Sequence, residues 1–151
     1  MKERIDYQEL LRSSPTVVIK ELKECYPAIR KVLLCLQRRV SLTEDEVYNL
    51  QLAVGEICAN AVEHGSKLSP DKSVRLSYAL HQNRLLFQIE GEGEGFDPDD
   101  LPDPTRRENL LKRRGRGIFL ARSLVDEIIF QDKERRVILV KKLTESSPLS
   151  T

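Results

Sequence analysis

The clearest element that the sequence predicts is a long amphipathic helix beginning at Thr43. Thr43 and Glu46 have the spacing of a capping box, in which each side chain accepts a hydrogen bond from the other residue's backbone amide. Apolar residues then recur at steps of three and four, the period of one helix face: Val47, Leu50, Val54, Ile57 and Ala61. Gly65 is the predicted end of the helix, because glycine readily adopts the left-handed conformation that follows a helix.

The residues before this helix predict shorter elements. Residues 1–14 are polar with a few apolar positions, and they fit either a helix or an extended arm. The β-branched residues between Thr16 and Leu22 predict a strand. Pro27 fits the first turn of a helix, and the apolar spacing after it extends that helix to about Arg39.

The residues after the long helix predict three further structures. Alternating apolar residues on both sides of Gln82-Asn83 predict a hairpin. A second helix is expected from about Gly117 to Glu127, and a last antiparallel pair of strands at residues 128–130 and 137–140. The inner face of that helix is expected to contain Ile118, Leu120, Ala121, Leu124 and Val125. This order predicts an α+β fold, a two-layer sandwich in which helices cover one face of a mixed, mostly antiparallel sheet.

Size and charge restrict the function classes. A chain of 151 residues fits one domain, expected here over residues 1–143, with a flexible Ser/Thr/Pro tail over 144–151. The net charge is +1 and aromatic residues make up 5%, which argues against a DNA-binding regulator. No signal peptide and no apolar run long enough for a membrane helix are seen, so we expect a cytoplasmic protein.

The three cysteines, Cys25, Cys35 and Cys58, do not form a recognisable framework. Their number is odd and no CxxC pair occurs, which argues against disulfides and against a zinc ribbon. We expect reduced, partly buried thiols.

Three polar residues follow one side of the long helix at steps of four: Glu56, Asn60 and His64. Each step of four turns a helix by only about 40°, so all three project from nearly the same side. Small neighbours of Asn60 would let a ligand approach the helix. The competing interpretation is an ordinary solvated stripe, since most helices have a polar face.

Residues 91–117 hold five of the seven glycines, and opposite charges are segregated along this part of the chain. Seven acids and no bases occur between Leu85 and Asp103, whereas six bases and one acid occur between Arg106 and Arg116. Gly-rich turns before a helix present free amides to phosphate, and a basic segment could close over polyphosphate. Each feature alone is also typical of a flexible loop.

In combination these motifs are far more specific. Glu-x-x-x-Asn-x-x-x-His-Gly on a helix, a hairpin, Gly-x-Gly-Phe-Asp-Pro and then Gly-x-Gly before a helix resemble the ATPase domain of gyrase-type topoisomerases, histidine kinases and bacterial anti-sigma factors. Residues 52–65 and 117–127 are similar to the anti-sigma factor and serine-protein kinase branch of that superfamily. The resemblance covers residues 16–143.

The resemblance implies roles for individual residues around bound ATP and Mg²⁺. Asn60 would hold Mg²⁺, for which an amide oxygen is a suitable hard ligand. Glu56 would act as general base on a partner's serine hydroxyl. The nucleotide site would be completed by Gly91, Gly93, Gly95, Arg113, Arg114, Gly115 and Gly117, of which the arginines would reach the γ-phosphate and the last two glycines would open a helix whose amides face the phosphates.

The resemblance also implies a partner-switching function. Such a protein sequesters a sigma factor and phosphorylates a serine of a STAS-type anti-anti-sigma factor, without direct contact to nucleic acid or membrane, and a homodimer is possible. One residue departs from the pattern, because Gly91 stands where the family normally has the aspartate that reads adenine. The alternative is therefore a kinase-inactive or weakly nucleotide-binding anti-sigma module of the same fold.

Overall fold

The computed structural model describes residues 7–68, 73–91, 113–131 and 135–143, and for residues 64–68 and 113–118 it describes the backbone alone. The elements follow in the order α1 (Tyr7–Arg12), β1 (Thr16–Ile19), the 3₁₀ turn η1 (Leu22–Glu24), α2 (Cys25–Leu36), α3 (Glu44–Leu68), β2 (Val74–His81), β3 (Arg84–Gly91), α4 (Arg113–Leu124), β4 (Glu127–Gln131) and β5 (Arg136–Lys142). The predictions made for residues 92–112, 132–134 and 144–151 fall outside the described ranges.

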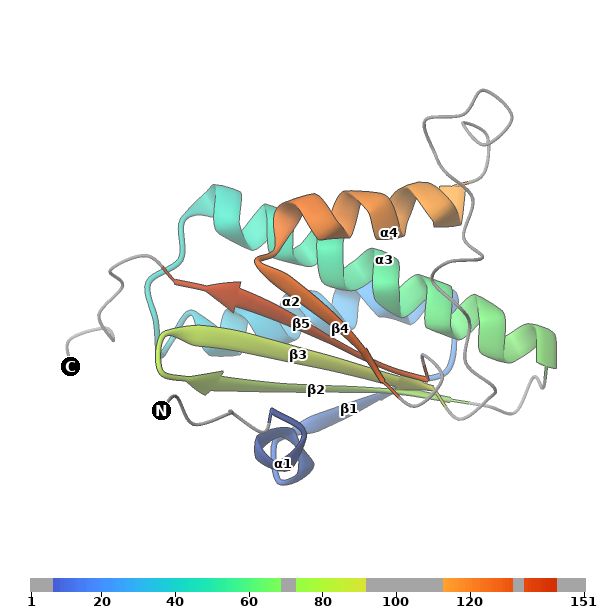
Figure 1. Cartoon of the computed structure of the whole chain (residues 1–151), viewed down its shortest axis with the longest axis horizontal. Coiled ribbons are helices and arrows are strands. Elements are labelled where there is room, and N and C mark those ends of the chain that lie inside the picture. The colour runs from blue at the N-terminus through green and yellow to red at the C-terminus, as the bar shows by residue number, and fades with distance from the viewer. Residues whose placement is uncertain (1–6, 69–72, 92–112, 132–134, 144–151) are drawn as a thin grey trace.

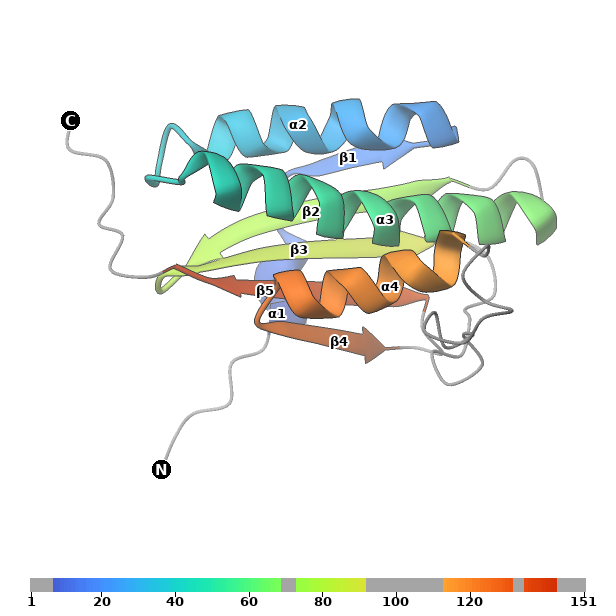
Figure 2. The same ribbon diagram turned by 90° about the horizontal axis from the view of Figure 1, so that it is seen from above.

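The predicted α+β fold is confirmed. Five strands form one sheet in the order β1-β2-β3-β5-β4, and α2, α3 and α4 lie together over one of its faces (Figures 1 and 2). Every strand pair in the described part of the chain is antiparallel, so the sheet is not mixed as predicted. The short α1 packs on the opposite face, where Leu11 meets Leu86, Ile138 and Val140.

The start of α3 is the predicted capping box. The Thr43 amide donates to Oε1 of Glu46 over 2.9 Å, and the Glu46 amide donates to Oγ1 of Thr43 over 3.0 Å. The predicted end at Gly65 is wrong, because α3 continues to Leu68. Glycine costs a helix interior only about 1 kcal/mol relative to alanine, so it weakens this helix without ending it.

The first predicted strand is too long at its C-terminal end. β1 stops at Ile19, because Oε1 of Glu24 accepts hydrogen bonds from the amides of Lys20 (3.1 Å) and Glu21 (2.8 Å) and begins the turn η1. The chain then enters α2 at Cys25, with Pro27 in its first turn as predicted.

The hairpin and the last strand pair agree with the prediction. Gln82 and Asn83 have φ of 47° and 61°, the two positive values that a tight type I′ turn requires. β2 and β3 then pair from His81–Arg84 to Val74–Gly91, and β4 pairs with β5.

The helix α4 differs from its prediction at both ends. It begins at Arg113 rather than Gly117 and ends at Leu124, so Glu127 already belongs to β4. Its predicted inner face is correct for Ala121 and Val125, which are buried, whereas Leu120 is 42% exposed. The packing of α4 along α3 holds the glycine-containing first turns in a helix that local propensity alone would not favour.

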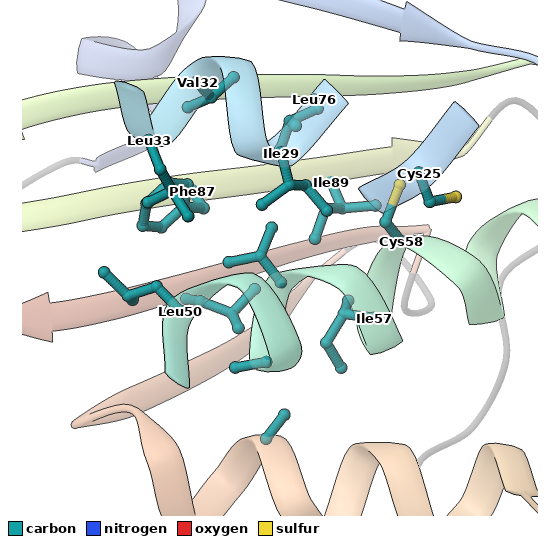
Figure 3. Packing of buried hydrophobic residues seen from close by; sticks show 14 of the residues in the cluster. Cys25, Ile29, Val32, Leu33, Leu50, Ile57, Cys58, Leu76, Phe87 and Ile89 are labelled. Atoms are coloured by element: carbon teal, nitrogen blue, oxygen red, sulfur yellow. The ribbon is translucent and has the colours of Figure 1, made fainter. Parts of the chain in front are cut away.

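The main core fills the space between the helices and the sheet. Leu33 and Ile29 from α2, and Leu50 and Ile57 from α3, meet Phe87 and its neighbours on β3 (Figure 3). Burial along β3 assigns Leu85, Phe87 and Ile89 to this face and Leu86 to the other, as the two-residue period of a strand requires. The same alternation decides to which face of the sheet the last residues of β3 belong.

Candidate functional site

The middle of α3 carries two buried polar side chains. Glu56 is 5% exposed and Asn60 is 7% exposed, in a part of the helix where every residue from Ala53 to Asn60 is buried. The solvated-stripe interpretation is therefore wrong for these two residues. His64 lies further along the same helix, and its side chain is outside the described part. Burying a carboxylate and an amide costs free energy unless they find polar partners, so this pair is a functional candidate.

Glu56 has a partner that the sequence did not indicate. The hydroxyl of Tyr26, in the first turn of α2, donates a hydrogen bond of 2.5 Å to Oε1 of Glu56. A hydrogen bond this short between a hydroxyl and a carboxylate belongs to the strong, charge-assisted class. It fixes the carboxylate from outside its own helix.

Gly55 makes this contact sterically possible. A Cβ atom at position 55 would lie 2.5 Å from Cε1 of Tyr26, 2.9 Å from Cδ1 and 3.0 Å from Cζ. The tyrosine ring therefore lies against the bare backbone of α3 and reaches Glu56 along it. A glycine inside a helical pattern is a signal of close packing, and this signal could have identified Gly55 from the sequence.

The end of β3 lies at the same end of the molecule as the C-terminal half of α3 and the start of α4 (Figure 2). By strand alternation Gly91 shares the helix-covered face with Ile89. No described atom lies within 4 Å of the position where a Cβ of Gly91 would stand, and its φ is not positive. A side chain at position 91 would thus project into open space beside α3.

Glu90 does not replace the absent aspartate. Its Oε2 accepts hydrogen bonds from Arg136 Nε (3.0 Å) and Nη2 (2.6 Å) on the opposite face of the sheet. The pair lines a polar cleft of about 440 Å³ beneath α1. This carboxylate therefore faces away from the α3 side, as strand alternation predicts.

The structure describes the remaining predicted site residues only in part. Gly93 and Gly95 lie outside the described ranges. Arg113 and Arg114 begin α4, and their side chains are not described. Gly115 and Gly117 do not precede the helix as predicted but lie within it. Because the first four amides of a helix lack internal partners, the donors at this end belong to residues 113–116, which include Gly115 but not Gly117.

Two thiols lie close to the Tyr26–Glu56 contact. Cys25 of α2 and Cys58 of α3 are buried neighbours (Figure 3), whereas Cys35 is exposed, and none of the three forms a disulfide. A hydrogen bond with Cys25, together with burial, raises the pKa of the Cys58 thiol. A raised thiol pKa and burial both oppose reactivity, so these two cysteines act as core residues.

The donor chemistry of the site fits a Mg²⁺–nucleotide complex. Mg²⁺ usually takes only one or two protein oxygens while phosphates and water complete its shell, so a buried amide oxygen such as that of Asn60 would suit it as a ligand. Among the described residues, no three His, Cys, Asp or Glu side chains gather into a metal site of their own. In the same part of the chain, no helix has the length and apolarity of a membrane span.

Comparison with known proteins gives one consistent result. The family model described as the histidine kinase-like ATPase domain matches residues 19–142. The serine-protein kinase RsbW of Bacillus subtilis (strain 168) is 28% identical over 148 residues, covering 94% of this chain and 88% of the relative. The protein of the same name from Bacillus licheniformis is 28% identical over 137 residues, covering 87% and 81%, and the one from Bacillus velezensis is 26% identical over 120 residues, covering 76% and 75%.

Proposed function

The chain belongs to the histidine kinase-like ATPase domain family, and on this basis we propose that it is an ATP-dependent protein-serine kinase and anti-sigma factor of a partner-switching pathway. It sequesters a sigma factor in one state. In the other it engages a STAS-type anti-anti-sigma factor and phosphorylates one of its serines. The curated relatives supply the kinase half of this proposal, since they carry the name serine-protein kinase.

One observation carries the proposal. Glu56 and Asn60 are buried one helical turn apart in the middle of α3, a helix that packs against both β3 and α4. Such a pair combines a general base with a hard oxygen ligand in a water-poor site, which phosphoryl transfer to a hydroxyl requires. An ordinary structural helix has no reason to bury both groups on one side.

Each residue then has a defined task. ATP bound with Mg²⁺ supplies the phosphoryl group that is transferred. The Asn60 amide oxygen would hold the metal, and the Glu56 carboxylate would accept the proton of the partner's serine hydroxyl as that oxygen takes the phosphoryl group and ADP leaves. Gly91, Gly93 and Gly95 border the nucleoside, while Arg113, Arg114 and the amides of the first turn of α4 face the phosphates.

The direct test is a phosphotransfer assay. The purified protein is mixed with Mg-ATP and each STAS-domain protein of the same genome, and mass spectrometry looks for the gain of one phosphate on a serine. Asn60→Asp, which keeps an oxygen ligand, and Asn60→Ala, which removes it, test the metal assignment. No phosphorylation of any STAS partner, with nucleotide bound, would contradict the kinase proposal.

A second candidate is supported by the end of β3. Gly91 brings no carboxylate to the nucleotide, and Glu90 is committed to Arg136 on the other face. Loss of one charge-assisted hydrogen bond weakens binding by roughly 1.5–3 kcal/mol, which is about ten- to a hundredfold. The alternative function is an anti-sigma module that exchanges partners without phosphorylating them. Calorimetry with Mg-ATP separates the two, because the kinase must bind nucleotide at cellular concentrations.

A further inference from the structure

We infer that Tyr26 is a positioning residue for Glu56 and that Gly55 is needed because only glycine leaves room for the Tyr26 ring. The inference rests on the proposed kinase function and adds to it a second helix, α2, as part of the site. Its basis is the contact of 2.5 Å between the Tyr26 hydroxyl and Oε1 of Glu56, made across 30 residues of sequence.

The geometry of the contact explains why a tyrosine is needed. Its hydroxyl must reach Glu56 from α2, and the ring that bridges this gap must pass over α3 at position 55. Any residue other than glycine at position 55 would place its Cβ 2.5 Å from Cε1 of the ring, closer than two non-bonded carbon atoms can approach. Gly55, Tyr26 and Glu56 thus form one unit in which the backbone of α3 is the support for the ring.

The benefit to the proposed reaction is orientation of the base. A glutamate side chain has three rotatable bonds, and a carboxylate free to rotate would seldom face the serine hydroxyl. The Tyr26 hydroxyl fixes one carboxylate oxygen, which holds the plane of the group. In this contact the phenol hydroxyl donates the hydrogen bond and the carboxylate oxygen accepts it.

The first test is Tyr26→Phe, which removes only the hydroxyl. We expect kcat for partner phosphorylation to fall about tenfold, a part of the roughly 10²–10⁴-fold that a positioned general base contributes. The KM for Mg-ATP and the Kd for the STAS partner should not change. Tyr48→Phe is the matched control, because Tyr48 lies on α3 but is 66% exposed.

The second test concerns Gly55. Gly55→Ala should lower kcat as Tyr26→Phe does, because the added methyl group displaces the ring. In the Tyr26→Phe background the same change should lower kcat by less than about twofold, since residues that act as one unit are not additive. Equal, independent losses from the two substitutions would overturn the role given to Gly55.

The outcomes separate this inference from the proposed function. If the wild-type protein phosphorylates its partner and Tyr26→Phe does so at the same kcat, the positioning role is wrong while the kinase proposal stands. If Tyr26→Phe weakens the KM for Mg-ATP and the Kd for the STAS partner as much as it lowers kcat, the contact supports the site as a whole and does not position the base, which also overturns the inference. If the wild-type protein transfers no phosphate, both fail together.

Discussion

Gly55 on α3 and Gly91 at the end of β3 are both buried or half-buried glycines near the site, yet their surroundings are opposite. A side chain at Gly55 would meet the ring of Tyr26 at once, whereas a side chain at Gly91 would meet no described atom within 4 Å. The first glycine is required by packing, and the second leaves space where the family resemblance predicts an aspartate side chain. On the α3 side, the packing of Tyr26 holds the Glu56 carboxylate in place. The β3 side lacks the carboxylate that was expected at position 91.

The largest effect is expected on the α3 side. Glu56→Gln should reduce phosphotransfer at least about 100-fold, because a positioned general base contributes roughly 10²–10⁴-fold and the amide cannot accept the proton. The substitution is nearly isosteric, and its carbonyl oxygen can still accept from the Tyr26 hydroxyl. Single-turnover phosphorylation at saturating Mg-ATP measures the rate.

Two controls make this prediction specific. Calorimetry should show unchanged binding of nucleotide and partner by Glu56→Gln. Glu44→Gln, at the exposed first turn of the same helix, should leave the rate unchanged. An undiminished rate in Glu56→Gln would show that Glu56 is not the general base. The contrast between a complete α3 side and an incomplete β3 side would then have no functional meaning.

The next effect is expected on the β3 side. Gly91→Asp should tighten ATP by about 1–3 kcal/mol, the range for a hydrogen bond to a charged group. The adenine amino group can donate to the new carboxylate, whereas the guanine carbonyl is repelled by it. Because the φ of Gly91 is not positive and the space beside it is open, we expect no loss of stability.

The matched control is Gly91→Asn, whose amide can accept from adenine or donate to guanine and should not discriminate between them. Calorimetry of ATP and GTP binding by both variants measures the difference. A stable Gly91→Asp protein with unchanged ATP affinity would show that position 91 does not face the base.

The sequence predicts the parts of this fold that are set by neighbouring residues. The capping box at Thr43 and Glu46 and the hairpin turn at Gln82 and Asn83 both depend on local chemistry, and both were found as predicted. The apolar period of α3 likewise identified the buried Leu50, Val54 and Ile57.

The sequence fails where distant segments decide the outcome. No local pattern joins Tyr26 to Glu56, because the contact depends on how α2 lies across α3. The early start of α4 has the same cause, since its glycine-containing first turns are held by packing against α3. The spacing and the family resemblance together identified Glu56 and Asn60 as candidates, whereas their burial is a property of the folded chain.

The third prediction compares the two glycines by stability. Gly55→Ala should destabilise the protein by about 0.5–2 kcal/mol, because the loss of a charged hydrogen bond, roughly 1.5–3 kcal/mol, outweighs a helix-propensity gain of about 1 kcal/mol. Gly91→Ala should stay within about 0.5 kcal/mol of the wild type, as surface changes usually do. Urea denaturation monitored by circular dichroism measures both. Equal effects of the two substitutions would mean that the difference in their surroundings has no energetic consequence.

The smallest effect is expected on the rate at which the thiols near Gly55 react with a maleimide. This rate reports whether α2 and α3 stay packed against each other. In the native protein only the exposed Cys35 should react rapidly with a maleimide, because Cys25 and Cys58 are buried and the pKa of Cys58 is raised by its hydrogen bond with Cys25 and by burial.

Gly91→Ala should leave one reactive thiol and change the slow labelling of the other two by less than about twofold, since the rate of labelling a buried group follows the free energy of opening. In Gly55→Ala the slow phase should quicken about 2–30-fold, the factor that corresponds to about 0.5–2 kcal/mol. Mass spectrometry of digested, time-quenched samples assigns the label to each cysteine. Rapid labelling of Cys58 in the wild-type protein would contradict the closed packing of α2 against α3, and it would remove the physical basis for the difference between Gly55 and Gly91.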